Sequence, residues 1–320
     1  MISFIIIGRN EGLKLVRCIQ SVKQIIVQNN IPAYEIIYVD SQSNDDSIEI
    51  LKQYKDLIII NITGEYNAAI GRNIGYRESN GEYLFFIDGD MELLPDFFFE
   101  IFDNNYRLKY DFVSGDILNY LYDSNGKYLG KAYYFKTKLT NDSLTSKVGG
   151  LFCIKRDLWE MVGGMNTKYR RSQDLDLGLR LIKHGVKLFR KKEIFVIHHT
   201  IDYAEKRRLI KMLFKGDFLY RGMLYRNHIF NRAIIAMLLR WDYSFLLLLF
   251  CTSISLAFKS FMPIFIYIFF VLVRAFLRSS GRIIKLLPEF CLILFGDLQV
   301  LLGLFFFYPK QKEIFYERIQ

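Results

Sequence analysis

Cysteine and histidine are scarce in this chain. Its 320 residues include four histidines and four cysteines, and Cys18, Cys153, Cys251 and Cys291 are far apart, with no CxxC pair. This spacing excludes the usual cysteine-rich zinc sites and disulfide frameworks, so we expect reduced, structural cysteines in a cytosolic compartment. The apolar run ISFIII is too short for a secretory signal and leads directly into polar residues, so we expect no N-terminal signal peptide.

Excess charge is almost absent from the first 200 residues. Residues 1–200 contain 26 Lys and Arg against 25 Asp and Glu, whereas residues 201–320 contain 17 against 8 and so account for nearly all of the net charge of +10. The same basic tail contains the apolar runs SFLLLLF, PIFIYIFFVLV and LLGLFFFY. Basic charge suits nucleic acid or an anionic membrane. Its combination with long apolar runs favours membrane lipid as the partner and excludes nucleic acid.

The basic tail divides into an amphipathic part and a hydrophobic part. Residues 201–242 are basic and amphipathic, which is typical of a helix at a membrane interface. Residues 243–320 predict hydrophobic helices, with a tight hairpin at about 244–277 and a third segment at about 286–308. Basic residues flank the hairpin, with little positive charge at its turn. The positive-inside rule therefore predicts a cell-membrane protein whose N-terminal domain lies on the cytoplasmic side.

The third hydrophobic segment contains two polar residues, Asp297 and Gln299. Both are costly in lipid. The segment therefore lies in the interface or packs on its neighbours, and the sequence leaves open whether it spans the membrane.

Residues 1–200 have the pattern of an α/β domain. Continuous apolar runs, typical of strands covered on both faces, alternate with amphipathic segments in the first 100 residues. This alternation predicts a doubly wound parallel sheet. The predicted strands are 3–7, 35–39, 57–60 and 83–87, and the predicted helices are about 11–28, 45–55 and 67–79, the first with Leu13, Val16, Ile19 and Val22 at helical spacing.

Polar residues follow three of these strands at the point where each strand ends. In doubly wound sheets, ligands bind beyond the carboxyl ends of the strands. We therefore expect a ligand site along this edge. The residues concerned are Gly8, Arg9, Asn10 and Glu11 after the first strand, Asp40 and Ser41 after the second, and Asp88, Gly89 and Asp90 after the fourth.

Asp88 and Asp90 are two residues apart at the end of an apolar strand. That spacing points both carboxylates the same way, and Gly89 lets the backbone approach a ligand closely. Carboxylate oxygens of this kind suit Mg²⁺ or Mn²⁺, which can bridge to a diphosphate. The alternative is a surface turn, because Asp-Gly is a common turn dipeptide.

Arg72 and Asp40 are candidates for contact with a nucleotide. Arg72 lies on a predicted helix just before the fourth strand, where a guanidinium can bind a phosphate; the alternative is a solvated helix face. Asp40 can accept hydrogen bonds from a base or a ribose, and its alternative role is a helix N-cap. Because Ser43, Asn44 and Asp45 are all suitable caps, we expect Asp40 to be free of that role.

Asp174 and Asp176 follow Gln173 at the start of a predicted amphipathic helix. Carboxylates there are stabilised by the helix dipole, which is one explanation of their presence. The other is a general base that takes a proton from an attacking hydroxyl, and spacing alone does not decide between the two aspartates. His198 and His199 follow another apolar strand, and alternation sends them to opposite faces. One of them could complete a metal site; the alternative is a polar strand end.

Taken in order, these segments resemble a family 2 glycosyltransferase of the GT-A fold. The similarity covers about residues 2–200 and is carried by SFIIIGRNEGLKL, VDSQSNDDS, GRNIG, FIDGDMEL, and the pair GGLFCIKRDLWEMVGGMN and QDLDLGLRL. It implies a membrane-associated enzyme of bacterial or archaeal polysaccharide and cell-envelope synthesis. Such an enzyme moves a sugar from a nucleotide-diphospho-sugar to a hydroxyl of a glycan or of a lipid-linked acceptor.

The resemblance also implies a role for each candidate residue. The loop Gly8–Glu11 and Asp40 with Ser41 would contact the nucleotide, and Arg72 would lie near it. The implied metal is Mg²⁺ or Mn²⁺ on the donor's diphosphate. Its ligands would be Asp88 and Asp90, with His198 a possible further one. Asp174 would be the base of a single inverting displacement.

Two departures from the family pattern bear on function. Gln173 replaces the usual acidic residue before the base, which removes a charge but leaves the base in place. The stretch Met237-Leu238-Leu239-Arg240-Trp241 lacks the glutamine of the QxxRW motif in processive synthases, which favours transfer of one sugar, for example to a polyprenyl-diphosphate-linked glycan. Two alternatives are a nucleotide-sugar-binding protein without transferase activity and a nucleotidyltransferase. GRNEGLKL is a poor phosphate loop for the latter.

Overall fold

The chain forms two compact units in the computed structural model. The first unit consists of Met1–Asp202 together with Gln311–Gln320, and the second is Tyr203–Lys310. The start of the basic segment predicted at 201–242 falls partly on residues 202–205, which lie outside the described residues. The structure describes residues 1–123, 125–134, 137–201, 206–279 and 282–320.

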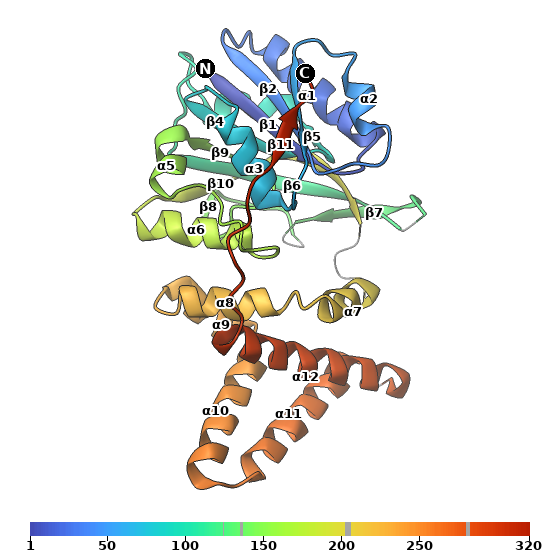
Figure 1. The fold of residues 1–320 in the computed structure, drawn as a ribbon, viewed down its shortest axis with the longest axis vertical. Helices are drawn as coiled ribbons and strands as arrows, with labels where there is room; N and C mark the ends of the chain where they lie inside the picture. The colour runs from blue at the N-terminus through green and yellow to red at the C-terminus, as the bar shows by residue number, and fades with distance from the viewer. Residues whose placement is uncertain (124, 135–136, 202–205, 280–281) are drawn as a thin grey trace. The chain divides into compact units, whose positions relative to one another are not determined.

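A parallel sheet forms the centre of the first unit (Figure 1). Its strands are the four predicted apolar runs, paired in the order β3-β2-β1-β4. Helices α1, α2 and α3 connect them, and the parallel α/β prediction is confirmed for this part. The bounds are β1 (Ile2–Gly8), α1 (Leu13–Gln28), β2 (Tyr34–Asp40), α2 (Ser47–Leu51), β3 (Leu57–Ile62), α3 (Ala68–Arg77) and β4 (Tyr83–Asp88).

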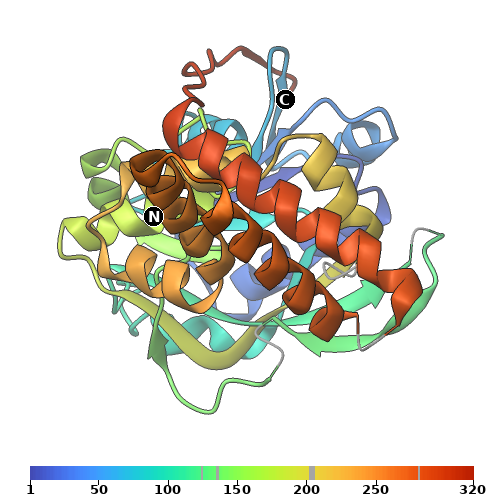
Figure 2. The same cartoon turned by 90° about the horizontal axis from the view of Figure 1, so that it is seen from below.

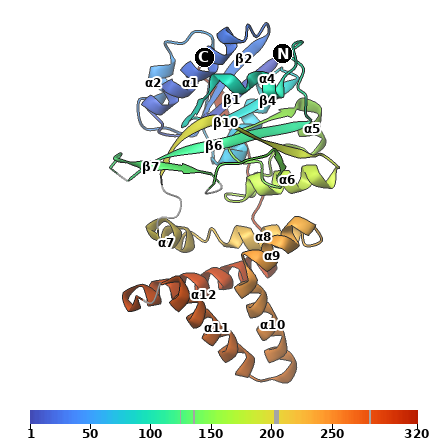
Figure 3. The same ribbon diagram turned by 180° about the vertical axis from the view of Figure 1, so that it is seen from behind.

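Antiparallel pairs extend the sheet beyond β4, so the sheet as a whole is mixed. The order continues β4-β9-β6-β10-β5, with β7 paired to β6 and β8 to β10. Only β6 and β10 are parallel to each other in this part, and they form its longest pairing (Figure 3). The bounds are β5 (Met91–Leu93), β6 (Phe112–Tyr122), β7 (Tyr128–Tyr133), β8 (Ser143–Leu144), β9 (Phe152–Lys155) and β10 (Leu188–Ile201).

Helices cover both faces of the sheet. One core contains the apolar side of α1 with the short helices η1 (Pro95–Phe97) and α4 (Phe98–Ile101). A core on the other face contains residues of α5 (Arg156–Met161) and α6 (Gln173–Lys183), with Trp159 fully buried. On α1 the prediction is confirmed for Ile19 and Val22, which are buried, and is wrong for Leu13, which is 73% exposed while Leu15 is buried instead.

The last residues of the chain return to the sheet as a strand, β11 (Tyr316–Arg318). β11 pairs antiparallel with β3, and the backbone N–H of Thr63 donates to the carbonyl of Phe315 at 3.0 Å. The sequence prediction placed residues 243–320 among hydrophobic helices, and for this final strand it is wrong. Pairing at the sheet edge satisfies backbone groups of β3 that would otherwise be exposed.

The second unit is helical (Figure 2). Among the described residues, α12 is the one helix that is long and apolar enough by itself to cross a membrane. Helices α9 and α10 reach that length only as a pair bent by 90°. The bounds are α7 (Lys206–Phe214), α8 (Leu219–Asn227), α9 (Arg232–Arg240), α10 (Tyr243–Phe258), α11 (Met262–Arg278) and α12 (Ile283–Phe305).

Candidate active site at the strand ends

The loops that follow β1 and β2 are tied together by hydrogen bonds. The backbone N–H of Asn10 donates to Ser43 Oγ at 2.8 Å, and the N–H of Asn44 donates to Asn10 Oδ1 at 2.8 Å. The N–H of Ser41 donates to the carbonyl of Gly8 at 2.9 Å. Asn10 takes a left-handed backbone with φ of 57°, a conformation that asparagine tolerates better than most residues. The two predicted nucleotide loops, residues 8–11 and 40–44, therefore form one rigid surface at the strand ends, the ledge.

Asp40 is fully buried beneath this ledge, and its carboxylate holds the ledge in shape. The Tyr38 hydroxyl donates to Asp40 Oδ1 at 2.7 Å, and the Ser43 hydroxyl and backbone N–H donate to the two carboxylate oxygens at 2.6 Å each. Asp40 is not the N-cap of α2, which is Asp46, but its carboxylate is occupied by these local bonds. An Asp side chain that accepts the N–H three residues ahead is a common turn-forming arrangement, which the spacing to Ser43 already contained.

Arg9 lies at the outer end of the ledge. Its guanidinium donates to the Tyr66 hydroxyl at 2.5 Å and stacks 4.4 Å from the centre of the Tyr66 ring. The Arg9 Nε also approaches the carbonyl of Gln42 at 3.4 Å. Arg9 therefore links the ends of β1, β2 and β3, and Tyr66 presents a partly exposed aromatic face beside them.

Asp88 is bound to Arg72, which reaches it from α3. The guanidinium donates to Asp88 Oδ1 at 2.5 Å, and the Arg72 side chain is only 3% exposed. Burial raises the pKa of Asp88 although the Arg72 charge opposes the shift, and the charge of Asp90 adds to it. A Cβ at Gly150 would overlap the Asp88 carboxylate, so this glycine is needed for the close approach.

Asp90 faces His198 on the neighbouring part of β10. His198 Nε2 lies 3.2 Å from Asp90 Oδ2, and His198 Nδ1 lies 2.9 Å from Asn119 Oδ1. Burial opposes the charged form of His198, but the hydrogen bond and charge of Asp90 outweigh it and raise the histidine pKa. His199 turns to the other face, as alternation predicts, and its Nε2 lies 3.2 Å from Glu92.

Glu11 joins the two aspartates in one acidic cluster. Burial raises the pKa of Glu11 from 4.5 to about 7, and the charges of Asp90 and Asp88 act in the same direction. Gly89 is packed below them, where its N–H donates to the carbonyl of Ile7 at 2.8 Å. Three carboxyl groups therefore share a confined region, and their mutual repulsion is partly offset by Arg72 at Asp88, by Lys14 at Glu11 and by His198.

The cluster has the donor chemistry of a divalent cation site. Excess carboxylate with an adjacent imidazole suits Mg²⁺ or Mn²⁺. Asp90 and His198 are in contact, whereas Asp88 is turned to Arg72. In the part of the chain that the structure describes, no group of three His, Cys, Asp or Glu side chains already has metal-binding geometry. The residues fit a cation by charge and donor type, and Asp88 would join them on release from Arg72.

Asp174 and Asp176 are in different surroundings although both lie in the first turn of α6. Asp174 is near the acidic cluster, since its charge contributes to the raised pKa of Asp88. Its Oδ2 lies 3.6 Å from Lys147 Nζ. Asp176 is 2% exposed and accepts a 2.9 Å bond from Arg180 Nε, one turn along the helix. Asp174 is therefore the more accessible of the two, with its side chain 19% exposed against 3% for Asp176.

Several functional candidates escape sequence reasoning. Lys147 donates to the Tyr134 hydroxyl at 2.6 Å. Burial lowers the pKa of Lys147, but the charges and hydrogen bonds of Asp174 and Tyr134 together outweigh it and raise this pKa to about 12. Asn119 on β6 orients His198, and Gly150 makes room for Asp88. Lys147 and Gly150 lie in the stretch KVGG, which forms the loop before β9, and its paired glycines are a signal of that loop.

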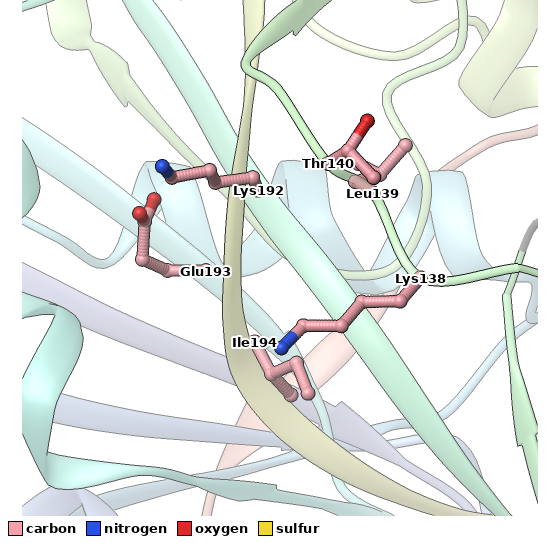
Figure 4. A pocket seen from close by; sticks show the side chains of 6 residues that line it. All are labelled: Lys138, Leu139, Thr140, Lys192, Glu193 and Ile194. Atoms are coloured by element: carbon pink, nitrogen blue, oxygen red, sulfur yellow. The ribbon is translucent and has the colours of Figure 1, made fainter.

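A separate pocket of about 500 Å³ lies beside β10 (Figure 4). Lys192 and Glu193 project from the strand on one side, while Lys138 extends towards Ile194 from the facing segment. None of the predicted site residues lines it. The acidic cluster and this pocket are therefore distinct.

Comparison with known proteins bears directly on this arrangement. The family model described as Glycosyl transferase family 2 matches residues 3–162, which is half of the chain. The chain belongs to this family. The matched region of this glycosyltransferase contains the β1 and β2 loops, Arg72 and the acidic cluster, and it ends before α6.

Individual relatives are distant or partial. Poly(ribitol-phosphate) beta-N-acetylglucosaminyltransferase TarP of Staphylococcus aureus is 36% identical over 85 residues, which are 25% of each chain. An uncharacterised glycosyltransferase of Haemophilus influenzae is 24% identical over 57% of this chain and 62% of its own length. This glycosyltransferase thus spans less than two thirds of either relative.

A third relative matches over nearly its whole length. It is the dolichyl N-acetyl-alpha-D-glucosaminyl phosphate 3-beta-D-2,3-diacetamido-2,3-dideoxy-beta-D-glucuronosyltransferase of Methanococcus voltae, 23% identical over 92% of this chain and 95% of that protein. Among solved structures, Staphylococcus aureus TarS 1-349 with UDP-GlcNAc covers 75% of this chain and 76% of its own, with a TM-score of 0.48 and 11% identity.

Proposed function

We propose that this glycosyltransferase moves one sugar, with inversion, from a nucleotide-diphospho-sugar to a hydroxyl of a glycan or polyprenyl-diphosphate-linked acceptor. The reaction uses Mg²⁺ or Mn²⁺ and takes place at the cytoplasmic face of the cell membrane. Its strongest support is the acidic cluster of Glu11, Asp88 and Asp90 with Asp174 within electrostatic reach. The Methanococcus voltae relative, whose name specifies a dolichyl phosphate-linked acceptor, supports the lipid-linked class.

In this proposal the ledge and the acidic cluster hold the donor. Arg9, Tyr66 and the loops after β1 and β2 present polar and aromatic groups to the nucleoside, while Arg72 supplies positive charge near the phosphates. Asp90 and His198, with Asp88, would hold the cation. When bound, the cation neutralises the negative charge that develops on the leaving nucleotide diphosphate.

Asp174 then acts as the general base. It takes the proton from the acceptor hydroxyl as that oxygen forms a bond to the sugar's anomeric carbon. The bond from that carbon to the phosphate oxygen breaks, and its electron pair leaves with the nucleotide diphosphate. Lys147 stays protonated beside Asp174 and fixes its position. A single displacement of this kind inverts the anomeric centre.

A donor screen tests the proposal. Purified protein is incubated with Mg²⁺ or Mn²⁺ and a panel of UDP-, GDP- and dTDP-sugars, and nucleotide release is followed with and without lipid-linked acceptors. We expect release from one donor class and its loss in Asp88→Ala and Asp174→Ala. Donor binding without release under every acceptor condition would instead indicate a binding protein without transferase activity.

A further inference from the structure

The second unit lies between β10 and β11 in the sequence, and both of these strands belong to the same sheet. β10 ends at Ile201, just before this unit, and β11 begins at Tyr316, soon after it. Because β11 pairs with β3 inside the first unit, both ends of the helical unit lie on one side of any membrane. The chain must then cross an even number of times. Helix α12 therefore cannot be the only crossing, although by itself it has the required length.

The hairpin of α10 and α11 is polar at its open end. Arg274, near the end of α11, donates to the Ser244 hydroxyl at the start of α10, and its second nitrogen lies 3.5 Å from the carbonyl of Trp241. Trp241 is 59% exposed, and Tyr243 beside it is 41% exposed. Exposed tryptophan and tyrosine next to arginine are typical of the level of lipid headgroups.

The closed end of the hairpin has the opposite character. Its exposed side chains are large and apolar, apart from Lys259 and Ser260 at the turn. Each helix has a length of about 25 Å at 1.5 Å per residue, against about 30 Å for the hydrocarbon layer. The apolar residues at this end are Leu256, Phe258, Phe261, Met262 and Phe265, all at least 63% exposed.

The middle of α12 contacts the open end of the hairpin through Ser244 and, through Tyr267, also a part of α11 nearer the tip. Asp297, well inside this helix, is 8% exposed and hydrogen-bonds with Ser244, the first-turn residue that Arg274 also contacts. The Tyr267 hydroxyl reaches the same carboxylate from α11 at 3.0 Å. If the open end is at the headgroups, the centre of α12 is there as well, whereas the centre of a spanning helix would lie in mid-bilayer.

Charged helices cover α12 on its other side. Gly222 on α8 and Gly303 on α12 are in backbone contact, since a Cβ on either would overlap the other helix. Arg226 donates to the carbonyls of Gly303 and Leu304 at 3.1 Å each. Gln299 of α12 donates to the carbonyl of Leu213 on α7 at 2.6 Å. A helix held between arginine-bearing helices and the polar end of a hairpin is in the interface.

From these contacts we infer how the second unit meets the bilayer: the α10–α11 hairpin inserts tip first, and α12 lies along the surface without crossing. Figures 1 and 3 show α12 across the open end of the hairpin, with α8 on the side away from the tip. The inference rests on the proposed membrane association and deepens it. Both flanks of α12 then remain on the side of the first unit, in keeping with the basic residues on each flank.

Single-cysteine labelling tests this topology. Cys18, Cys153 and Cys251 are buried and stay in place, and the partly exposed Cys291 is replaced by serine. Exposed sites are introduced as Ser260→Cys at the tip, Arg282→Cys at the start of α12, and Lys127→Cys on the first unit as the reference. The full-length protein is bound to phosphatidylcholine–phosphatidylglycerol vesicles, and a charged, membrane-impermeant maleimide is added from one side at a time.

We expect Arg282→Cys to be labelled from the same side as Lys127→Cys, and Ser260→Cys to be protected from that side. Labelling of Arg282→Cys only from the opposite side would mean that α12 crosses and would overturn the inference. So would labelling of Ser260→Cys from the reference side as fast as Lys127→Cys. Failure of the protein to float with the vesicles would instead remove the membrane association itself, without bearing on sugar transfer.

Discussion

The Arg72 guanidinium donates a 2.5 Å hydrogen bond to Oδ1 of Asp88, from a side chain that is almost fully buried. The buried charge of Arg72 thus acts on the carboxylate at the end of β4. It opposes the rise in the Asp88 pKa that burial causes. Removing this arginine leaves the acidic cluster without its buried cation.

We therefore expect Arg72→Met to weaken donor binding, because it removes the positive charge that the proposal places near the donor's phosphates. The expected loss is about ten- to hundredfold, the size of one charge-assisted hydrogen bond. The loss should be larger at pH 6 than at pH 8, because Asp88 without Arg72 holds its proton to a higher pH. Calorimetric titration of the nucleotide at both pH values measures it. Arg17→Met, at an exposed position on α1, is the matched control. Unchanged affinity in Arg72→Met would separate this arginine from the donor site.

Substitutions of Asp174 and Asp176 should affect different properties, the first the transfer reaction and the second the stability of the fold. Asp174→Asn removes the proposed base, so transfer should fall on the order of 10²–10⁴-fold with the melting temperature nearly unchanged. Asp176→Asn breaks the buried pair with Arg180 and should lower the free energy of unfolding by about 2–4 kcal/mol, with activity per folded molecule largely kept. Transfer assays and thermal melts on both variants measure this. Loss of transfer in Asp176→Asn alone would reverse the assignment.

The raised pKa of Glu11 should make the stability of EDTA-treated protein depend on pH. The folded chain holds this proton up to about pH 7, whereas the ordinary pKa is 4.5, so between these values the folded state binds more protons than the unfolded state. Stability should therefore fall as pH rises from 5 to 7, by about 1–3 kcal/mol. Glu11→Gln should flatten this dependence, and denaturant unfolding at several pH values tests it. An equal slope in both proteins would contradict the raised pKa.

The C-terminal strand predicts the effect of truncation. Deleting residues 311–320 removes the pairing of β11 with β3 and the reciprocal bonds of Thr167 with Lys312, at 3.2 and 3.1 Å. Each lost backbone bond contributes about 0.5–1.5 kcal/mol, so we expect a lower melting temperature of the sheet unit. Arg318→Ala, an exposed side chain whose loss keeps the backbone pairing of β11, is the milder control. An unchanged melting temperature after the full deletion would show that β11 does not support the sheet.

The parts of the fold with continuous apolar runs could be predicted from the sequence. β1 and β4 are almost fully buried, so their strand ends and the polar residues there could be placed in advance. β11 could not, because YER at a sheet edge is held by backbone bonds that leave no apolar pattern. The antiparallel extension beyond β4 was not among the strands predicted from apolar runs.

In the candidate site, too, local patterns predicted some residues, whereas contacts between distant segments could not be predicted. Asp88, Asp90 and Asp174 were predicted from their positions in strands and helices, and the structure brings them to one region. The contact of Arg72 with Asp88 joins α3 to β4, and that of Lys147 with Asp174 joins a loop to α6. Such long-range pairs depend on how elements pack, which local patterns do not record. The burial of Asp176 against Arg180 is likewise a packing feature, and it favours Asp174 as the base without testing that role.

The central claim is that a divalent cation, held by the acidic pair after β4, carries the donor's diphosphate. Its most direct test is calorimetric titration of the nucleotide diphosphate with Mn²⁺ and again with EDTA, on the wild-type protein and on Asp90→Asn. The account predicts tight binding only with Mn²⁺ in the wild type, and weak binding under both conditions in Asp90→Asn. Equal wild-type affinity with Mn²⁺ and with EDTA would contradict it.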